Sequence, residues 1–193
     1  GTKILSLVGN VKNARRVADA GADFVVAQGT EAGGHTGRIA TLALVPQVID
    51  AVYPTPVIAA GGIADAKGVA AAMALGAAGV QIGTAYLLCP EATTSPLHRA
   101  ALKSDAARHT ALTNVFTGRP ARGIVNRVMR ELGPISSAAP AFPLAPAAVA
   151  PLRAKAEGQG SGDFSPLWAG QNVSGCKEIP AAELTRQLAA GLH

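Results

Sequence analysis

The sequence predicts an α/β fold in which parallel strands alternate with helices. Four short apolar runs of strand type contain Ile4, Phe24, Val57 and Val80 at equivalent positions, and a segment with a helical apolar face follows each of the first three. Near-continuous apolar strands are typical of parallel strands that are buried on both faces. The short connections between the runs fit right-handed strand–helix–strand crossovers.

The pattern assigns these elements in chain order. We expect strands over residues 3–8, 22–27, 56–60 and 79–87, and helices over residues 11–20, around 44–52 and over 65–75. Asn10 and Asp65 stand where helix N-caps are needed, and Leu44, Val48 and Val52 recur on one face of the second helix. Four strand–helix units are visible, whereas a closed (β/α)8 barrel has eight.

The remainder of the chain, from Cys89, changes character. Ser95 followed by Pro96 predicts a helix that runs to about Lys103. We expect further helices over residues 105–112, 121–132 and 181–192, and an extended surface segment over residues 134–151, which are rich in Ala and Pro. Residues 89–193 are therefore predicted to form a helical and extended tail that packs on residues 1–88, and not an independent domain.

Glycine turns close the last two predicted strands. Gly61 and Gly62 follow the third strand, and Gly83 lies at the end of the fourth. Since the carboxyl ends of parallel strands meet at one edge of a sheet, backbone N–H groups of both turns can approach one ligand phosphate, as the loops after the last two strands of (β/α)8 barrels do. The sequence thus predicts an enzyme with a phosphate-anchored cofactor.

A third glycine-rich loop, over residues 28–38, opens at the same edge. Its four glycines allow the backbone to lie flat against a planar ring, and His35 can act as a base near neutral pH. The alternative is an ordinary turn with a surface histidine. The convergence of three glycine loops favours a place for His35 in an active site.

Composition argues against several classes of function. Basic residues are scattered and aromatic residues make up only 4% of the chain, which disfavours nucleic-acid binding. Cys89 and Cys176 lie far apart, as expected for free thiols in the cytoplasm, and the four histidines (His35, His98, His109 and His193) form no metal-binding cluster. The chain has no apolar run long enough for a membrane span.

Three of these motifs closely resemble the nitronate monooxygenases, formerly called 2-nitropropane dioxygenases. They are VAQGTEAGGH over residues 26–35, AGGIAD over residues 60–65 and QIGT over residues 81–84. The similarity continues through GRPARG at residues 118–123 and LWAGQ at residues 167–171, so that it covers essentially the whole chain.

The resemblance implies an FMN-dependent barrel that oxidises alkyl nitronates with O2 to a carbonyl compound and nitrite. By this resemblance, Gln28 and Gly33 would contact the flavin, and His35 would be the catalytic base. Gly62 and the run Gln81, Ile82, Gly83 and Thr84 would hold the phosphate. FMN is expected in place of FAD because no Gly-x-Gly-x-x-Gly dinucleotide motif is present. We expect Trp168 to be packed, and Arg119, Arg122 and His98 to face water.

The similarity begins near the fifth strand of the family's barrel. Residues 1–88 would then form the carboxyl-terminal half of a TIM-type barrel, with two free sheet edges and an exposed inner layer containing Val25, Ile58 and Ile82. We expect a homo-oligomer or association with the missing half. Two alternatives stay open: an FMN-dependent enoyl-acyl carrier protein reductase, whose Gly-Gly-His loop is very similar, and an inactive FMN-binding barrel fragment.

Overall fold

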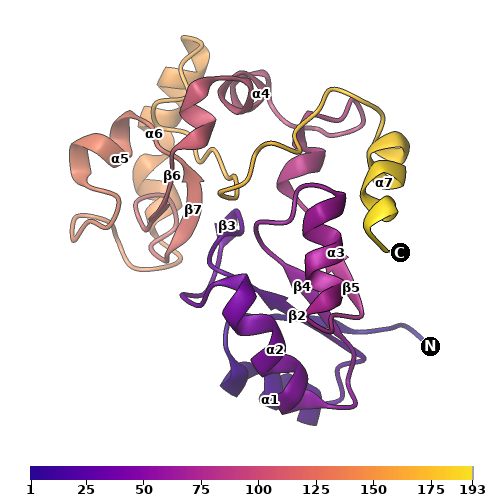
Figure 1. Ribbon diagram of the computed structural model, residues 1–193. Coiled ribbons are helices and arrows are strands. Elements are labelled where there is room, and N and C mark those ends of the chain that lie inside the picture. The colour runs from indigo at the N-terminus through magenta and orange to yellow at the C-terminus, as the bar shows by residue number, and fades with distance from the viewer. Residues whose placement is uncertain (193) are drawn as a thin grey trace.

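The computed structural model describes residues 1–192, which form a four-stranded parallel sheet and a tail that returns to it (Figure 1). The order across the sheet is β1 (Leu5–Val8), β2 (Phe24–Gln28), β4 (Val57–Ala60) and β5 (Gly79–Gln81). All neighbouring strands are parallel, with Leu7 opposite Val26 and Val26 opposite Ile58. The predicted α/β class is confirmed.

Three helices cover one face of this sheet: α1 (Val11–Asp19), α2 (Thr41–Val52) and α3 (Ala66–Ala74). As predicted, Asn10 and Asp65 cap the first and third, each accepting a backbone N–H at 2.8 Å. The core between sheet and helices contains Val25, Val57 and Val48, which are at most 3% exposed. Burial of these apolar side chains holds the strands in the register that brings their carboxyl ends together.

Among residues 1–192, the opposite face of the sheet is open at its β1 edge, whereas Val26 in the middle of that face is 2% exposed. Leu5 and Leu7 on β1 are 52% and 51% exposed. The expectation of an inner layer with Val25, Ile58 and Ile82 was correct only for Ile58. Because side chains alternate along a strand, Val25 points to the helices, and Ile82 packs with α3 and the C-terminal helix.

The last strand is shorter than predicted. Residues 79–87 were expected to be extended, but β5 ends at Gln81 and a 3-10 helix, η1 (Thr84–Leu88), follows. Gly83, with φ −109° and ψ −66°, turns the chain out of the strand. Ala85 and Tyr86 of this helix pack with α7 (Ala181–Ala189), whereas Leu87 and Leu88 pack with Leu102 and Leu167.

The tail contains a β-hairpin that the sequence did not predict. As expected, α4 (Pro96–Lys103) begins after the Ser95 cap. The predicted helix over residues 105–112 is wrong, since η2 (Asp105–Arg108) gives way to β6 (Thr110–Thr113). The predicted helix over residues 121–132 is also wrong in its first half, which forms β7 (Ala121–Ile124) before α5 (Arg127–Leu132).

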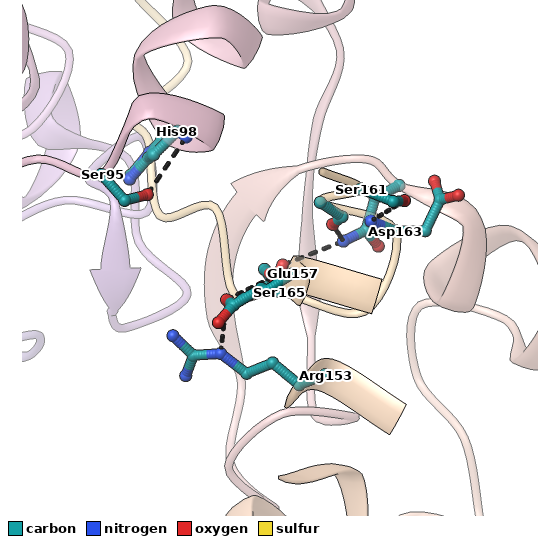
Figure 2. Close-up of polar contacts among 9 residues, drawn as sticks. Ser95, His98, Arg153, Glu157, Ser161, Asp163 and Ser165 are labelled. Carbon is teal, nitrogen blue, oxygen red and sulfur yellow. Dashed lines mark hydrogen bonds and ion pairs between the residues drawn. The ribbon is translucent and has the colours of Figure 1, made fainter. Parts of the chain in front are cut away.

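Helix α6 (Ala145–Gly158) replaces the second half of the segment predicted to be extended. Its first turn holds Pro146, where a missing N–H costs nothing, and six alanines support the helix. The carboxylate of Glu157, near its end, accepts hydrogen bonds from Arg153 Nε and Ser165 Oγ, both at 2.7 Å (Figure 2). The chain ends with α7 and η3 (Ala190–Leu192).

Among residues 1–192, no helix combines the length and the apolar character that crossing a bilayer requires.

The half-exposed apolar face leads to a first prediction. A protein consisting of residues 1–193 alone should self-associate, because Leu5 and Leu7 and the free edges of β1 and β5 offer apolar area and unpaired backbone groups. Sedimentation velocity should detect dimers or larger species at micromolar concentration. The double variant Leu5→Ser/Leu7→Ser should sediment as smaller species than the parent protein. A parent protein that is monomeric and unfolds in one sharp, cooperative transition would contradict the prediction.

Candidate functional site

A cavity of about 320 Å³ lies where the parallel strands end. All seven residues predicted to bind the cofactor line it: Gln28, Gly33, Gly62, Gln81, Ile82, Gly83 and Thr84. They come from β2, the loop after it, the turn after β4 and the end of β5. The cavity falls within the size range of small-molecule sites in proteins.

The side chain of Gln28 supplies a polar group without a partner. Gln28 is 8% exposed, and its Oε1 atom finds no hydrogen-bond donor among residues 1–192. A buried amide oxygen without a partner costs free energy that a bound ligand can recover by donating a hydrogen bond. Gln28 therefore marks the floor of the cavity as a place for a ligand with a hydrogen-bond donor.

Two glycines shape the cavity in different ways. A Cβ on Gly83 would meet no atom within 4 Å, so its backbone borders open space. A Cβ on Gly33 would come within 2.8 Å of the Ala169 carbonyl carbon, so Gly33 allows the tail to approach the loop. The first arrangement suits a ligand phosphate, and the second closes the cavity wall.

The glycine loop over residues 28–38 is fixed from within. Thr30 N–H donates to the Ile39 carbonyl at 2.8 Å, and Thr36 Oγ1 donates to the Gly29 carbonyl at 2.7 Å. The Glu31 carboxylate accepts from both the backbone N–H and the hydroxyl of Thr41, at the start of α2. A negative charge at a helix N-terminus is stabilised by the helix dipole.

Arg122 also fixes the loop, although the sequence suggested that it faces water. It is 6% exposed, and its Nε donates to the Thr30 carbonyl at 2.8 Å. Burial lowers the pKa of its guanidinium, and the nearby charge of Glu31 opposes that effect. β7 lies beside β3 (Gly34–His35) (Figure 1). Their pairing places Gly34 opposite Arg122 and so brings Arg122 to the loop.

His35 lies beside the main cavity, in an adjoining one of about 280 Å³ that Gln28 and Arg119 also line. Its Nε2 is 2.9 Å from Thr117 Oγ1, and its ring meets the Phe142 ring edge-on with centroids 6.0 Å apart. Despite these contacts, His35 as a whole is exposed. Gln28 thus separates the cavity of the predicted cofactor residues from the predicted base.

The tail contributes residues that sequence reasoning missed or left aside. Trp168, Gly170 and Asn172 line the main cavity, and Gly170 N–H donates to Thr84 Oγ1 at 2.9 Å. Trp168 is also packed as expected, with its ring edge-on to Phe116. Gln171 lines a neighbouring cavity, and its backbone N–H donates to the Glu31 carbonyl.

Other polar candidates fall outside the site. His98 was expected to face water, but it is half-buried near Ser95 (Figure 2), and burial lowers its pKa. Cys89 and Cys176 are free thiols, and burial raises the pKa of Cys176 to about 11. In the described part of the chain no group of three His, Cys, Asp or Glu side chains is arranged to hold a metal ion, and His193 lies outside that part.

The comparison with known proteins decides the family. A model of nitronate monooxygenase matches residues 1–191. The chain belongs to the nitronate monooxygenase family. The nitronate monooxygenase of Pseudomonas aeruginosa is 43% identical over 100% of this chain and 58% of the relative, and that of Paraburkholderia phytofirmans is 40% identical over 97% and 54%. The chain therefore spans between half and three fifths of these relatives.

Solved structures support the same assignment. The nitroalkane oxidase of Streptomyces ansochromogenes superposes with a TM-score of 0.91 at 42% identity, covering 100% of this chain and 58% of that one. FabK of Thermotoga maritima superposes with a TM-score of 0.81 at 33% identity, covering 99% and 61%. The predicted barrel type is confirmed by these neighbours, of which this chain matches just over half.

Members of the nitronate monooxygenase family use FMN, and the cavity fits it. The unpartnered Gln28 oxygen offers an acceptor to a ring N–H, and the open backbone at Gly83 leaves room for a phosphate.

Gly83 provides a direct test of that fit. Gly83→Val should abolish FMN binding, because its side chain would occupy the open space, while the fold should persist, because the backbone of Gly83 has an ordinary negative φ. The flavin content of purified protein and its far-UV circular dichroism measure the two effects. Gly158→Val, at an exposed glycine that also borders open space, is the control and should keep its flavin. Full occupancy in Gly83→Val would place the phosphate elsewhere.

Arg122 gives a second prediction. Arg122→Met should lower the free energy of unfolding by about 1–3 kcal/mol, because the half-buried Thr30 carbonyl loses its donor. Arg130→Met, on the exposed face of α5, should change it by no more than about 0.5 kcal/mol. Urea titration followed by Trp168 fluorescence measures both, and equal stability of the two variants would show that Arg122 does not hold the loop.

Proposed function

We propose that this chain forms the FMN-binding and base-bearing part of an enzyme that oxidises alkyl nitronates with O2 to a carbonyl compound and nitrite. The observation that carries the proposal is the convergence of seven predicted cofactor contacts on one cavity. His35 lines the adjoining cavity, and Gln28 lines both. Membership of the nitronate monooxygenase family and similarity to a nitroalkane oxidase support the same chemistry. We also propose that residues 89–193 are not an independent domain but pack on residues 1–88 and act with them as one unit.

The chain's own residues divide the binding of FMN between them. Gln28 and Gly33 contact the flavin ring, and Gly62 with residues 81–84 holds the phosphate through backbone N–H groups. Bound FMN would supply the redox chemistry between the organic substrate and O2. Trp168 and Leu87 line the cavity and exclude water from the ring.

His35 acts as the base. A neutral nitroalkane must lose its α proton before oxidation, and an imidazole beside the ring can accept that proton. A preformed nitronate is already the anion, so with that substrate His35 orients the negative charge. His35 is exposed and lines the adjoining cavity, where Arg119 adds a positive charge.

The small-molecule partners are then an alkyl nitronate and O2, and we propose a cytoplasmic location. The remaining barrel wall comes either from a second copy of the chain or from a segment that supplies further strands. An enoyl reductase remains the rival function. It has weaker support, because FabK of Thermotoga maritima superposes with a TM-score of 0.81 at 33% identity, against 0.91 and 42% for the nitroalkane oxidase.

Two parallel assays separate these functions. Oxygen uptake with propionate 3-nitronate, accompanied by nitrite release, is expected of the FMN-loaded protein. Oxidation of NADH with a crotonyl thioester is expected of an enoyl reductase instead. Activity in the second assay alone would overturn the proposal, and a yellow protein inactive in both would indicate an inactive FMN-binding fragment.

The base role makes a quantitative prediction. His35→Asn should lower kcat/KM for a neutral nitroalkane by about 10²- to 10⁴-fold, the usual contribution of a general base, while keeping its FMN and most nitronate turnover. Rates over pH 6 to 9 for both forms of one substrate measure this. His109→Asn, at an exposed histidine near η2, serves as the control. Unchanged rates with both substrate forms would show that His35 is an ordinary surface histidine with no role in the reaction.

A further inference from the structure

The turn between β6 and β7 presents one hydroxyl to the imidazole of His35. Thr117 lies in this turn, 82 residues from His35 in sequence, and its Oγ1 is 2.9 Å from His35 Nε2. The pairing of β3 with β7, in which His35 lies opposite Ala121, brings the two side chains together. A contact made through two paired strands has a defined geometry.

The hydrogen bonds of Thr117 fix the direction of that contact. A threonine hydroxyl has one proton to donate and two lone pairs to accept with. Thr117 Oγ1 donates to the Arg119 carbonyl at 2.9 Å and accepts from the Arg119 N–H at 3.3 Å. A hydroxyl that gives its one proton to the Arg119 carbonyl can only accept from His35, and that arrangement requires the hydrogen on Nε2.

We propose that Thr117 is a positioning residue that holds neutral His35 as the Nε2–H tautomer and leaves the lone pair of Nδ1 as the atom that takes the substrate proton. The proposal rests on the role of His35 as base under the proposed function. It adds which nitrogen acts and which residue selects it, since the tautomer of a histidine is set by the hydrogen bond at its other nitrogen.

Neighbouring side chains keep this arrangement in place. Gly118 has φ +82°, and a Cβ there would come within 2.6 Å of backbone atoms of residues 140–142, so the turn is pressed against that segment. Phe142 from the same segment packs edge-on against the His35 ring, and the Arg119 guanidinium lies 5.2 Å from the Phe142 ring centroid. Rotation of the imidazole is thereby restricted, and Arg119 is the charged side chain that shares its cavity.

Nitrogen NMR tests the tautomer without reference to activity. In FMN-loaded protein labelled with 15N-histidine, two-bond proton–nitrogen correlations at pH 8 distinguish the two neutral tautomers of His35. We expect the Nε2–H form in the parent protein and in Thr117→Ser, and a mixture of tautomers in Thr117→Val. The control Thr185→Val removes a hydroxyl on α7 that pairs with Tyr86 of η1 and should leave the spectrum of His35 unchanged.

Kinetics then tests the consequence. Thr117→Val should lower kcat/KM for a neutral nitroalkane about tenfold, as expected for one lost hydrogen bond, with little change for the nitronate, and Thr117→Ser should restore it. An Nδ1–H tautomer in the parent, or an unchanged tautomer in Thr117→Val, would overturn the proposal. If His35→Asn leaves the rates unchanged, the base role fails. The NMR spectra then still decide whether Thr117 sets the tautomer.

Discussion

The hydrogen bond from the buried Arg122 guanidinium to the Thr30 carbonyl joins the two parts of this molecule. Burying a cation costs free energy unless hydrogen bonds compensate it. Separation of the hairpin from the glycine loop would therefore leave the Arg122 guanidinium without this hydrogen bond. β3 pairs with β7 beside this contact, and the pairing sets the positions of Gly34 and His35. The tail thus adds to the hydrogen bonds within the four-glycine loop and helps to fix this wall of the cavity.

Local patterns in the sequence predicted the strand–helix units well, because their signals lie within single elements. Asn10 and Asp65 begin helices by capping them, and the apolar runs around Phe24 and Val57 form strands. The hairpin escaped prediction because Ile124, Val128 and Leu132 recur at helical spacing, although Ile124 belongs to β7 and only the other two to α5. Gly123 lies against the Leu167 carbonyl there, a tertiary contact with no local sequence signal.

The same distinction applies to the site. Gln28, Gly33, Gly62 and residues 81–84 could be selected because glycine turns at strand ends converge by topology. Gly170 and Asn172 could not, since they reach the cavity only through the return of the tail. For Gly170, the available signal was its place in the LWAGQ motif. Its N–H donates a hydrogen bond to Thr84 Oγ1, which lies 86 residues away in sequence. Arg122 was misjudged because its burial depends on the unpredicted β7.

The central claim is that one cavity at the carboxyl ends of the strands holds FMN next to His35. A crystal structure of the FMN-loaded protein tests it most directly. The account predicts the phosphate at the backbone of Gly62, Gly83 and Thr84, and the ring within hydrogen-bonding reach of the Gln28 amide. A flavin in the apolar groove of about 460 Å³ lined by Ile58, Val80 and Leu188, with the Gln28 cavity empty, would contradict it.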